Sequence, residues 1–264
     1  MSKHHPRKRF GQHFLTDPGV IDAIVNAIGP QDDDVIVEIG SGPGAITVPI
    51  AKRCGRLHAI ELDRDLAARL RTQFQNDEHV TIHEADALSF DFSTLGTSLR
   101  VVGNLPYNIS TPLLFHLLKQ RNVIQDMHFM LQKEVVDRMA AEPGSKAFGR
   151  LTIMLGCYLD IDALFDVDRL AFDPPPEVTS AVVRLRPKPD TDVRIDDSQL
   201  LASLVAAAFS QRRKTLRNAL KAHASEEDLR ALDIDPGLRP ENIAIPDWVA
   251  LANHLASKNS PASA

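Results

Sequence analysis

Short apolar runs alternate with stretches of helical spacing through the first half of the chain, and this alternation constrains the fold more than any other feature of the sequence. The apolar runs occupy residues 35–39, 57–60, 80–83, 99–102 and 127–131. The first run, VIVEI, is nearly continuous, which is typical of a strand buried on both faces. Helical stretches such as 65–74 and 113–118 separate the runs. Strands that alternate with helices predict an α/β fold with a parallel, doubly wound sheet and right-handed crossovers.

The pattern changes near residue 189. The segment RPKPDTDVRIDD is polar and contains prolines, which is typical of a linker. Beyond it, residues 200–209, 214–222, 226–232 and 247–256 have helical character without a strand signal. We therefore expect two domains: a Rossmann-like sheet domain over residues 1–189 and a small all-helical domain over 190–264, with Trp248 in the core of the second.

The composition narrows the class of protein. Of the 264 residues, 44% are hydrophobic and 25% are charged, as in ordinary globular proteins. No apolar run approaches the roughly 20 residues of a membrane helix, and the start MSKHHPRKRF lacks the apolar centre of a signal peptide. Cys54 and Cys157 have no metal-binding spacing and suggest buried free thiols. These features predict a cytoplasmic protein with no metal site and no membrane partner.

Basic residues are concentrated in two segments, although the net charge is −5. No acidic residue accompanies the basic residues of either segment: Lys3, Arg7, Lys8 and Arg9 within 1–16, and Arg212, Arg213, Lys214, Arg217 and Lys221 within 207–223. A solvated helix face would explain either cluster alone. Because phosphate contacts depend on local potential rather than on total charge, the two clusters together favour an anionic partner.

Polar or glycine residues follow each of the first four predicted strands. Gly40 begins the turn GSGPG after the first strand, and its G-x-G-x-G spacing differs from the G-x-G-x-x-G of dinucleotide sites. Glu61 ends the second strand, where an acid can accept hydrogen bonds from both ribose hydroxyls. Asp86 follows the third strand and could accept from an adenine amine, or simply cap a turn. Ligands of doubly wound sheets bind at these strand ends, so the joint pattern predicts a nucleotide-like cofactor.

The fourth strand ends in Asn104-Leu105-Pro106-Tyr107, which could be an ordinary turn or the acceptor end of a methyl-transfer site. An exocyclic amine on a base is a weak nucleophile because its lone pair is delocalised into the ring. The Asn104 oxygen and a backbone carbonyl near Pro106 could orient that amine toward an electrophilic methyl, while Tyr107 stacks on the base for about 1–3 kcal/mol. Alignment for in-line transfer from a sulfonium then supplies most of the catalysis, without a strong general base.

Longer motifs resemble the KsgA-type family of ribosomal small-subunit RNA adenine dimethyltransferases nearly from end to end. These motifs are RKRFGQHFL at 7–15, VEIGSGPG at 37–44, AIELDRDL at 59–66, EADAL at 84–88, NLPYNIST at 104–111, LQKEVVDRM at 131–139, FGRLTIM at 148–154, FDPPPEVTSAVVRL at 172–185 and FSQRRKTLRNAL at 209–220. The resemblance implies an enzyme that uses S-adenosylmethionine to dimethylate N6 of two adjacent adenosines in the 3′-terminal hairpin loop of small-subunit (16S) ribosomal RNA. It also implies a role in subunit biogenesis.

The resemblance assigns roles to individual residues. It implies cofactor contacts from His13, Leu15, Gly40, Glu61, Asp86 and Asn104. It implies that the target adenine is held by Asn104, Pro106 and Tyr107, with Phe172 on its other face. It implies RNA contacts from Arg7, Lys8, Arg9, Arg212, Arg213, Lys214 and Arg217. Residues 1–189 would then be the methyltransferase domain and 190–264 the RNA-binding domain of a monomer.

Two positions depart from the family pattern. His13 stands where the family often has Asn, which weakens the expected cofactor contact, although His13 can still donate a hydrogen bond. Glu177 stands where Lys is common, which argues against a phosphate contact there.

Three other functions are open at this point. An Erm-type methyltransferase of large-subunit RNA shares the fold and the asparagine motif, but QRRKTLRNAL and FDPPPEV favour the small-subunit enzyme. An assembly factor that binds immature subunits, with dispensable methylation, is a rival of another class, although the two functions can coexist. A dehydrogenase is disfavoured by the glycine spacing and by the lack of an acid–base pair for hydride transfer.

Overall fold

The computed structural model describes residues 13–211 and 213–259, which form parts of two compact units. Unit 1 combines Met1–Val136 with Ile161–Pro187, and unit 2 combines Asp137–Asp160 with Lys188–Ala264. The change near residue 189 therefore coincides with a unit boundary, but residues 137–160 group with the C-terminal unit rather than with the sheet domain. They do so because Phe148, Ile153 and Cys157 pack into the hydrophobic core of unit 2.

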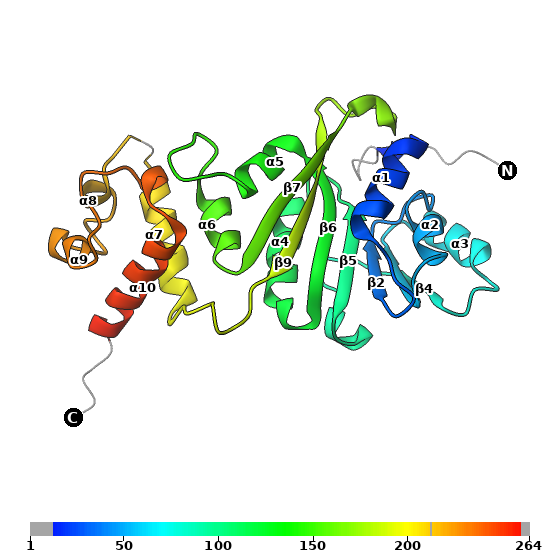
Figure 1. Ribbon diagram of the computed structural model, residues 1–264, viewed down its shortest axis with the longest axis horizontal. Helices are drawn as coiled ribbons and strands as arrows, with labels where there is room; N and C mark the ends of the chain where they lie inside the picture. The colour runs from blue at the N-terminus through cyan, green and yellow to red at the C-terminus, as the bar shows by residue number, and fades with distance from the viewer. Residues whose placement is uncertain (1–12, 212, 260–264) are drawn as a thin grey trace. The chain divides into compact units, whose positions relative to one another are not determined.

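Unit 1 is built on a seven-stranded sheet with the order β4-β3-β2-β5-β6-β9-β7 (Figure 1). The strands are β2 (Val35–Ile39), β3 (Arg56–Glu61), β4 (Val80–Glu84), β5 (Leu99–Asn104), β6 (Ile124–Gln132), β7 (Leu159–Val167) and β9 (Ser180–Pro187). The pairings among β2 to β6 are all parallel, which confirms the prediction for the five apolar runs.

The sheet also contains two strands that the search for continuous apolar runs missed. Strand β9 pairs antiparallel with β6, and β7 lies at the edge beside β9, so the sheet is mixed rather than wholly parallel. The sequence of β7, LDIDALFDV, begins with five residues that alternate between apolar and polar. Alternation is typical of a strand with one solvated face, and this signal could have located β7.

Helices cover both faces of the sheet in unit 1 (Figure 1). On one face, α1 (Pro18–Ile28), α2 (Thr47–Ala51) and α3 (Arg64–Gln73) pack Ile24, Ile50 and Leu70 against strand residues such as Ile36 and Val102. The other face is covered by α4 (Ser110–Lys119), which buries Leu113, Leu114 and Leu117, and is followed along the chain by α5 (Lys133–Met139). Neighbouring strand residues point to opposite faces, so a near-continuous apolar strand such as β2 serves both layers.

Helix α1 has a residue that favours a helix terminus at each end. The Asp17 carboxylate accepts a hydrogen bond from the Val20 amide, and Pro18 stands in the first turn. At the other end Gly29 adopts a left-handed conformation, with φ of 59°, and its amide donates to Val25 O.

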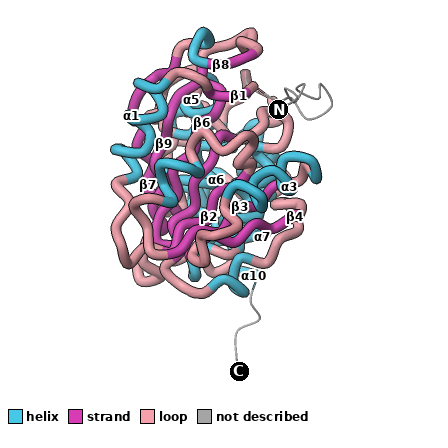
Figure 2. Tube along the Cα trace, turned by 90° about the vertical axis from the view of Figure 1, so that its right-hand side faces the viewer, coloured by secondary structure: helices cyan, strands magenta, loops and turns pink. Residues whose placement is uncertain are grey.

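A small antiparallel sheet joins the first described residues of unit 1 to a distant segment (Figure 2). Strand β1 (Phe14–Leu15) pairs with β8 (Phe172–Asp173), with Leu15 opposite Phe172. The Thr16 amide extends this contact by donating to Ala171 O at 2.8 Å. The pairing places the segment after residue 12 beside the Phe172 segment, although the two are far apart in sequence.

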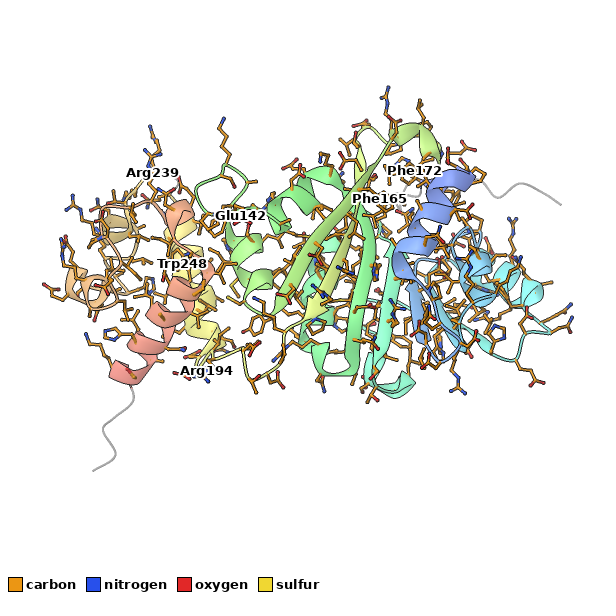
Figure 3. The ribbon with its side chains drawn as sticks, viewed as in Figure 1. Glu142, Phe165, Phe172, Arg194, Arg239 and Trp248 are labelled. Atoms are coloured by element: carbon orange, nitrogen blue, oxygen red, sulfur yellow. The ribbon has the colours of Figure 1, made fainter. Side chains whose placement is uncertain are left out.

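Unit 2 contains the helices α6 (Arg150–Gly156), α7 (Ser198–Phe209), α8 (Leu216–Ala219), α9 (Glu226–Arg230) and α10 (Ile245–Asn259). Trp248 is fully buried in its core, as predicted (Figure 3). Cys157 of unit 2 and Cys54 of unit 1 are buried free thiols, which also agrees with expectation. Over the described ranges, no helix is both long enough and apolar enough to cross a membrane.

Candidate functional site

A cavity of about 210 Å³ lies within unit 1 at the carboxyl ends of strands β2 to β5. Every residue for which the sequence predicted a cofactor or adenine contact lines this cavity: His13, Leu15, Gly40, Glu61, Asp86, Asn104, Pro106, Tyr107 and Phe172. The chain passes from β2 outward to β4 and then returns to β5 on the other side of β2. Such a reversal of strand order leaves a crevice at the strand ends, where doubly wound sheets bind ligands.

Two glycines allow the backbone to come close at this crevice. Gly40 has a φ of 73°, which glycine adopts readily and other residues rarely do. A Cβ at Gly103 would lie only 2.5 Å from Ile39 O, so a side chain there would push β5 away from β2. Glycine at position 103 therefore keeps Asn104 next to the glycine turn that follows β2.

Glu61 fixes the glycine turn as well as lining the cavity. Its Oε2 accepts a hydrogen bond from the Gly42 amide, and its Oε1 accepts one from the Asp63 amide, both at 2.8 Å. Burial raises the pKa of Glu61, and these backbone hydrogen bonds oppose the rise. Each carboxylate oxygen can accept a further hydrogen bond, so Glu61 keeps capacity for ribose hydroxyls.

Asp86 caps a turn and also lines the cavity, and its contact with an adenine amine stays a prediction. Its Oδ1 accepts a hydrogen bond from the Leu88 amide at 2.9 Å, which is the turn-capping role. The residue is exposed and also lines the cavity, so its carboxylate is accessible to a ligand amine.

Glu38 is a site residue that sequence reasoning missed. It lies within β2, is only 2% exposed and lines the cavity. Burial raises the pKa of the Glu38 carboxyl from 4.5 to about 7. The nearby Thr47 and Ser41 hydroxyls oppose this rise, although neither is placed to form a well-aligned hydrogen bond with Glu38. Within the described residues, Glu38 Oε2 and Ser41 Oγ have no hydrogen-bond partner. An acid inside the otherwise apolar run VIVEI was the signal that could have identified it.

The charge of the lining is strongly one-sided. Carboxylates come from Glu38, Glu61, Asp63 and Asp86, whereas the described lining contains no Lys or Arg. Such a lining suits a ligand with positive charge and hydroxyl groups, and in the described part it offers no basic side chain to a pyrophosphate. The cavity therefore fits a sulfonium nucleoside better than a nicotinamide dinucleotide.

Asn104 ends β5 with its amide group in a defined orientation. Its Nδ2 donates a hydrogen bond to His13 O at 3.2 Å, so Oδ1 is the end of the amide that is left to accept. The Pro106 carbonyl already accepts from the Ile109 amide at 3.1 Å and retains a second lone pair. Two acceptors are thus available on one loop, as the amine-orientation hypothesis requires.

Tyr107 is partly buried and is held at its side-chain hydroxyl and at its backbone carbonyl. Its hydroxyl shares a hydrogen bond of 2.9 Å with Ser180 Oγ, and its backbone carbonyl accepts from Ser110 Oγ. The His13 ring stacks beside it, with centroids 6.1 Å apart and an interplanar angle of 25°. His13 Nδ1 in turn donates to Pro174 O at 2.7 Å.

Phe172 is mainly a core residue with one edge at the cavity. It is 3% exposed and packs in the same cluster as Leu15, with Phe165 of β7 against that cluster (Figure 3). A stacking contact with an adenine would use the part of the ring that lines the cavity. Its role on the second face of the base stays a prediction.

The residues predicted to contact RNA are only partly described. Arg7, Lys8, Arg9 and Arg212 lie outside the described residues. Arg213, Lys214 and Arg217 are exposed in unit 2, and Arg217 forms a loose ion pair with Glu226 at 3.8 Å. Glu177 is exposed in unit 1.

Comparison with known proteins extends over nearly the whole chain. Residues 3–257 match the family model described as "Ribosomal RNA adenine dimethylase". The chain is 57% identical to ribosomal RNA small subunit methyltransferase A of Thiobacillus denitrificans over 255 residues, which is 97% of this chain and 100% of that protein. It is 55% identical to the protein of the same name from Chromobacterium violaceum over 261 residues, covering 98% of this chain and 99% of that protein.

Solved structures share the fold over both units. A dimethyladenosine transferase from Plasmodium falciparum superposes with a TM-score of 0.84 at 26% identity, covering 93% of this chain and 98% of that one. The 23S rRNA methyltransferase ErmE superposes with a TM-score of 0.74 at 23% identity, covering 92% and 99%. The similarity to ErmE shows the shared fold alone.

Proposed function

The chain belongs to the ribosomal RNA adenine dimethylase family, and we propose that its substrate is a pair of adjacent adenosines in the 3′-terminal hairpin loop of small-subunit ribosomal RNA, each methylated twice at N6. The enzyme is an S-adenosylmethionine-dependent methyltransferase. The observation that carries the proposed mechanism is the position of Asn104: it ends β5 beside the glycine turn, with its amide oxygen left to accept.

The cavity fits the methyl donor on three counts. The glycine turn at Gly40 admits close approach of a ligand to the backbone. Glu61 has remaining acceptor capacity for ribose hydroxyls, and Asp86 is accessible to an adenine amine. The buried atoms Glu38 Oε2 and Ser41 Oγ, which lack partners among the described residues, suit the polar amino-acid end of the same molecule. When bound, S-adenosylmethionine supplies an electrophilic methyl on a positively charged sulfur.

Asn104 Oδ1 and the free lone pair of Pro106 O would accept the two hydrogens of the adenine amine. This arrangement draws the nitrogen lone pair out of conjugation and directs it along the line of transfer. Tyr107 would cover one face of the base and Phe172 the other. Because the amine is held in line, proximity and orientation account for most of the rate, and no side chain has to act as a strong base.

The RNA partner is proposed to bind through the basic residues of both segments, in the described region Arg213, Lys214 and Arg217. A basic patch on an acidic chain suits local contacts with phosphate groups. We place the enzyme in the cytoplasm, as a monomer acting on small subunits during assembly. An assembly-factor role is compatible with this proposal, because it requires no further property of the cavity.

Transfer of radiolabelled methyl groups tests the substrate. Small subunits that lack the modification should accept label in the presence of the enzyme, and large subunits should not. Label found on large-subunit RNA instead would contradict the assignment and favour an Erm-type activity.

Asn104→Ala tests the amine-orientation step. This substitution removes one of the two acceptors, so methyl transfer should fall by at least about a hundredfold, the scale observed when one hydrogen bond to a transition state is removed. Subunit binding should stay within a few-fold of wild type, measured by filter binding. Undiminished turnover would refute the orientation role of Asn104.

A further inference from the structure

Ser180 is a buried polar residue at the site that no part of the mechanism above uses. It is 1% exposed and is the first residue of β9. Because β9 runs antiparallel to β6, its first residue lies at the carboxyl end of the parallel strands, where the cavity is. Met130 of β6 pairs with Asn104 of β5 and with Val182 of β9, so these three residues form one row across the sheet. Ser180 lies two residues from Val182 along β9, beyond that row.

The side chain of Ser180 reaches one residue of the adenine site. Its Oγ lies 2.9 Å from the Tyr107 hydroxyl. Tyr107 itself is on a loop, whereas Ser180 belongs to a ladder of paired residues in the sheet, with Gln132 opposite it. A side chain on a loop that takes part in catalysis is held in a precise position only when the contacts that support it come from rigid helices or strands.

The other contacts of Tyr107 leave its ring incompletely held. Ser110 Oγ fixes its backbone carbonyl, and the His13 ring covers one side. Neither contact fixes the far end of the ring, which carries the hydroxyl. The hydrogen bond to Ser180 supplies that third point. Burial raises the pKa of the Tyr107 phenol above its ordinary value near 10, so the hydroxyl is protonated at neutral pH and can donate or accept in this bond.

We infer that Ser180 is a positioning residue for methyl transfer: its hydrogen bond to the Tyr107 hydroxyl sets the orientation of the ring on which the target adenine stacks. The inference rests on the proposed function, because it presumes that Tyr107 covers an adenine. Ser180 itself does not touch the reacting atoms. Its effect is on kcat, through the fraction of bound adenines that are aligned with the methyl.

A double-mutant cycle tests this inference with unmodified small subunits as substrate. Ser180→Ala and Tyr107→Phe each remove the same hydrogen bond, and a neutral hydrogen bond corresponds to roughly a 3- to 10-fold change. Each single variant should therefore lower kcat by about that factor, and the double variant should be no slower than either one. Ser180→Thr, which keeps the hydroxyl, should restore most of the rate. Thr72→Ala, which removes a hydroxyl hydrogen bond on the exposed face of α3, is the matched control and should behave as wild type.

Several outcomes would overturn the inference. They are an unchanged kcat in Ser180→Ala, losses that multiply in the double variant, or a loss that appears only in the affinity for S-adenosylmethionine. If Ser180→Ala does not fold, Tyr107→Phe carries the test alone, because it removes the bond from the other end. Absence of transfer by the wild-type enzyme would instead contradict the proposed function, so the two failures are distinguishable.

A spectroscopic readout separates ring orientation from general stability. The sequence has two tyrosines, so Tyr158→Phe leaves Tyr107 as the sole site for 3-fluorotyrosine. In this background the fluorine resonance of residue 107 should shift or broaden on Ser180→Ala. An unchanged resonance would show that the bond does not hold the ring.

Discussion

Asn104 and Glu38 show how single residues acquire their chemistry from their neighbours. The Asn104 amide could point either way, and the hydrogen bond to His13 O selects the orientation that leaves its oxygen as an acceptor. Glu38 would be an ordinary carboxylate in water, and burial at the foot of the cavity raises its pKa to about 7. Both effects arise from the tertiary contacts of the residue and not from its own type.

The raised pKa of Glu38 makes a definite prediction for stability in the absence of ligand. Below pH 4.5 the carboxyl is protonated in both the unfolded and the folded protein. Between 4.5 and about 7 the folded protein retains a proton that the unfolded chain has released, so the free energy of unfolding falls as the pH rises. The contribution amounts to roughly 3 kcal/mol over this window, at about 1.4 kcal/mol per pKa unit.

Glu38→Gln removes this titration. The difference in free energy of unfolding between wild type and Glu38→Gln should therefore decrease as the pH rises from 4.5 to 7 and level off above it. Urea unfolding at a series of pH values measures it. Parallel curves for the two proteins would show that Glu38 is not protonated in the folded state.

At the scale of elements, Arg100 ties the start of β5 to its neighbours at the end of the sheet opposite the cavity. Its side chain is largely buried and pairs with Asp34 at 2.7 Å and Asp126 at 2.9 Å. It also donates to the carbonyls of Ile28 and Gly29, which end α1. The network satisfies helix-end carbonyls that would otherwise lack partners.

Arg100→Met should lower the free energy of unfolding by about 3–5 kcal/mol, because it leaves two carboxylates buried without their partner. Arg184→Met is the matched control: Arg184 lies on β9 and pairs with Asp162 at 3.0 Å, but both side chains are more than a third exposed. Its loss should stay below about 1 kcal/mol. Equal losses for the two variants, measured by urea unfolding, would contradict a special role for the Arg100 network.

Some elements of the fold could be predicted from the sequence, and others could not. The five parallel strands followed from local apolar runs, and the strand-end residues Gly40, Glu61, Asp86 and Asn104 converge because parallel strands share one carboxyl edge. The antiparallel β9 was missed, and with it the hydrogen bond of Ser180 with Tyr107, because that bond spans 73 residues. The protonation of Glu38 likewise depends on packing that no local pattern encodes.

At the scale of the whole molecule, we expect the charge of the basic cluster in unit 2 to contribute to subunit binding. Replacing Arg212, Arg213 and Lys214 with Ala should weaken subunit binding and reduce the slope of log affinity against log salt by about 2 to 3, because each phosphate that a basic side chain neutralises adds somewhat less than one to the slope. Replacing the exposed Lys52, Arg56 and Arg64 of unit 1 removes the same charge and should leave the slope nearly unchanged. If both triple variants behave alike, the cluster is an ordinary solvated surface.

The division into units also belongs to this scale. Residues 137–160 pack with the helical unit through Phe148, Ile153 and Cys157. After them the chain returns to unit 1 for most of β7 and for β9. The sequence pattern grouped residues 137–160 with the sheet because the composition changes only near residue 189. The excursion of the chain into unit 2 and back is a tertiary feature that composition does not reveal.

Mapping the methylated nucleotides after reaction with unmodified small subunits tests the proposed function most directly. The proposed function predicts dimethylation at N6 of two adjacent adenosines in the 3′-terminal hairpin loop, with at least about a hundredfold less transfer by Asn104→Ala. Methylation at a single isolated adenosine, on another base or only in large-subunit RNA would contradict it.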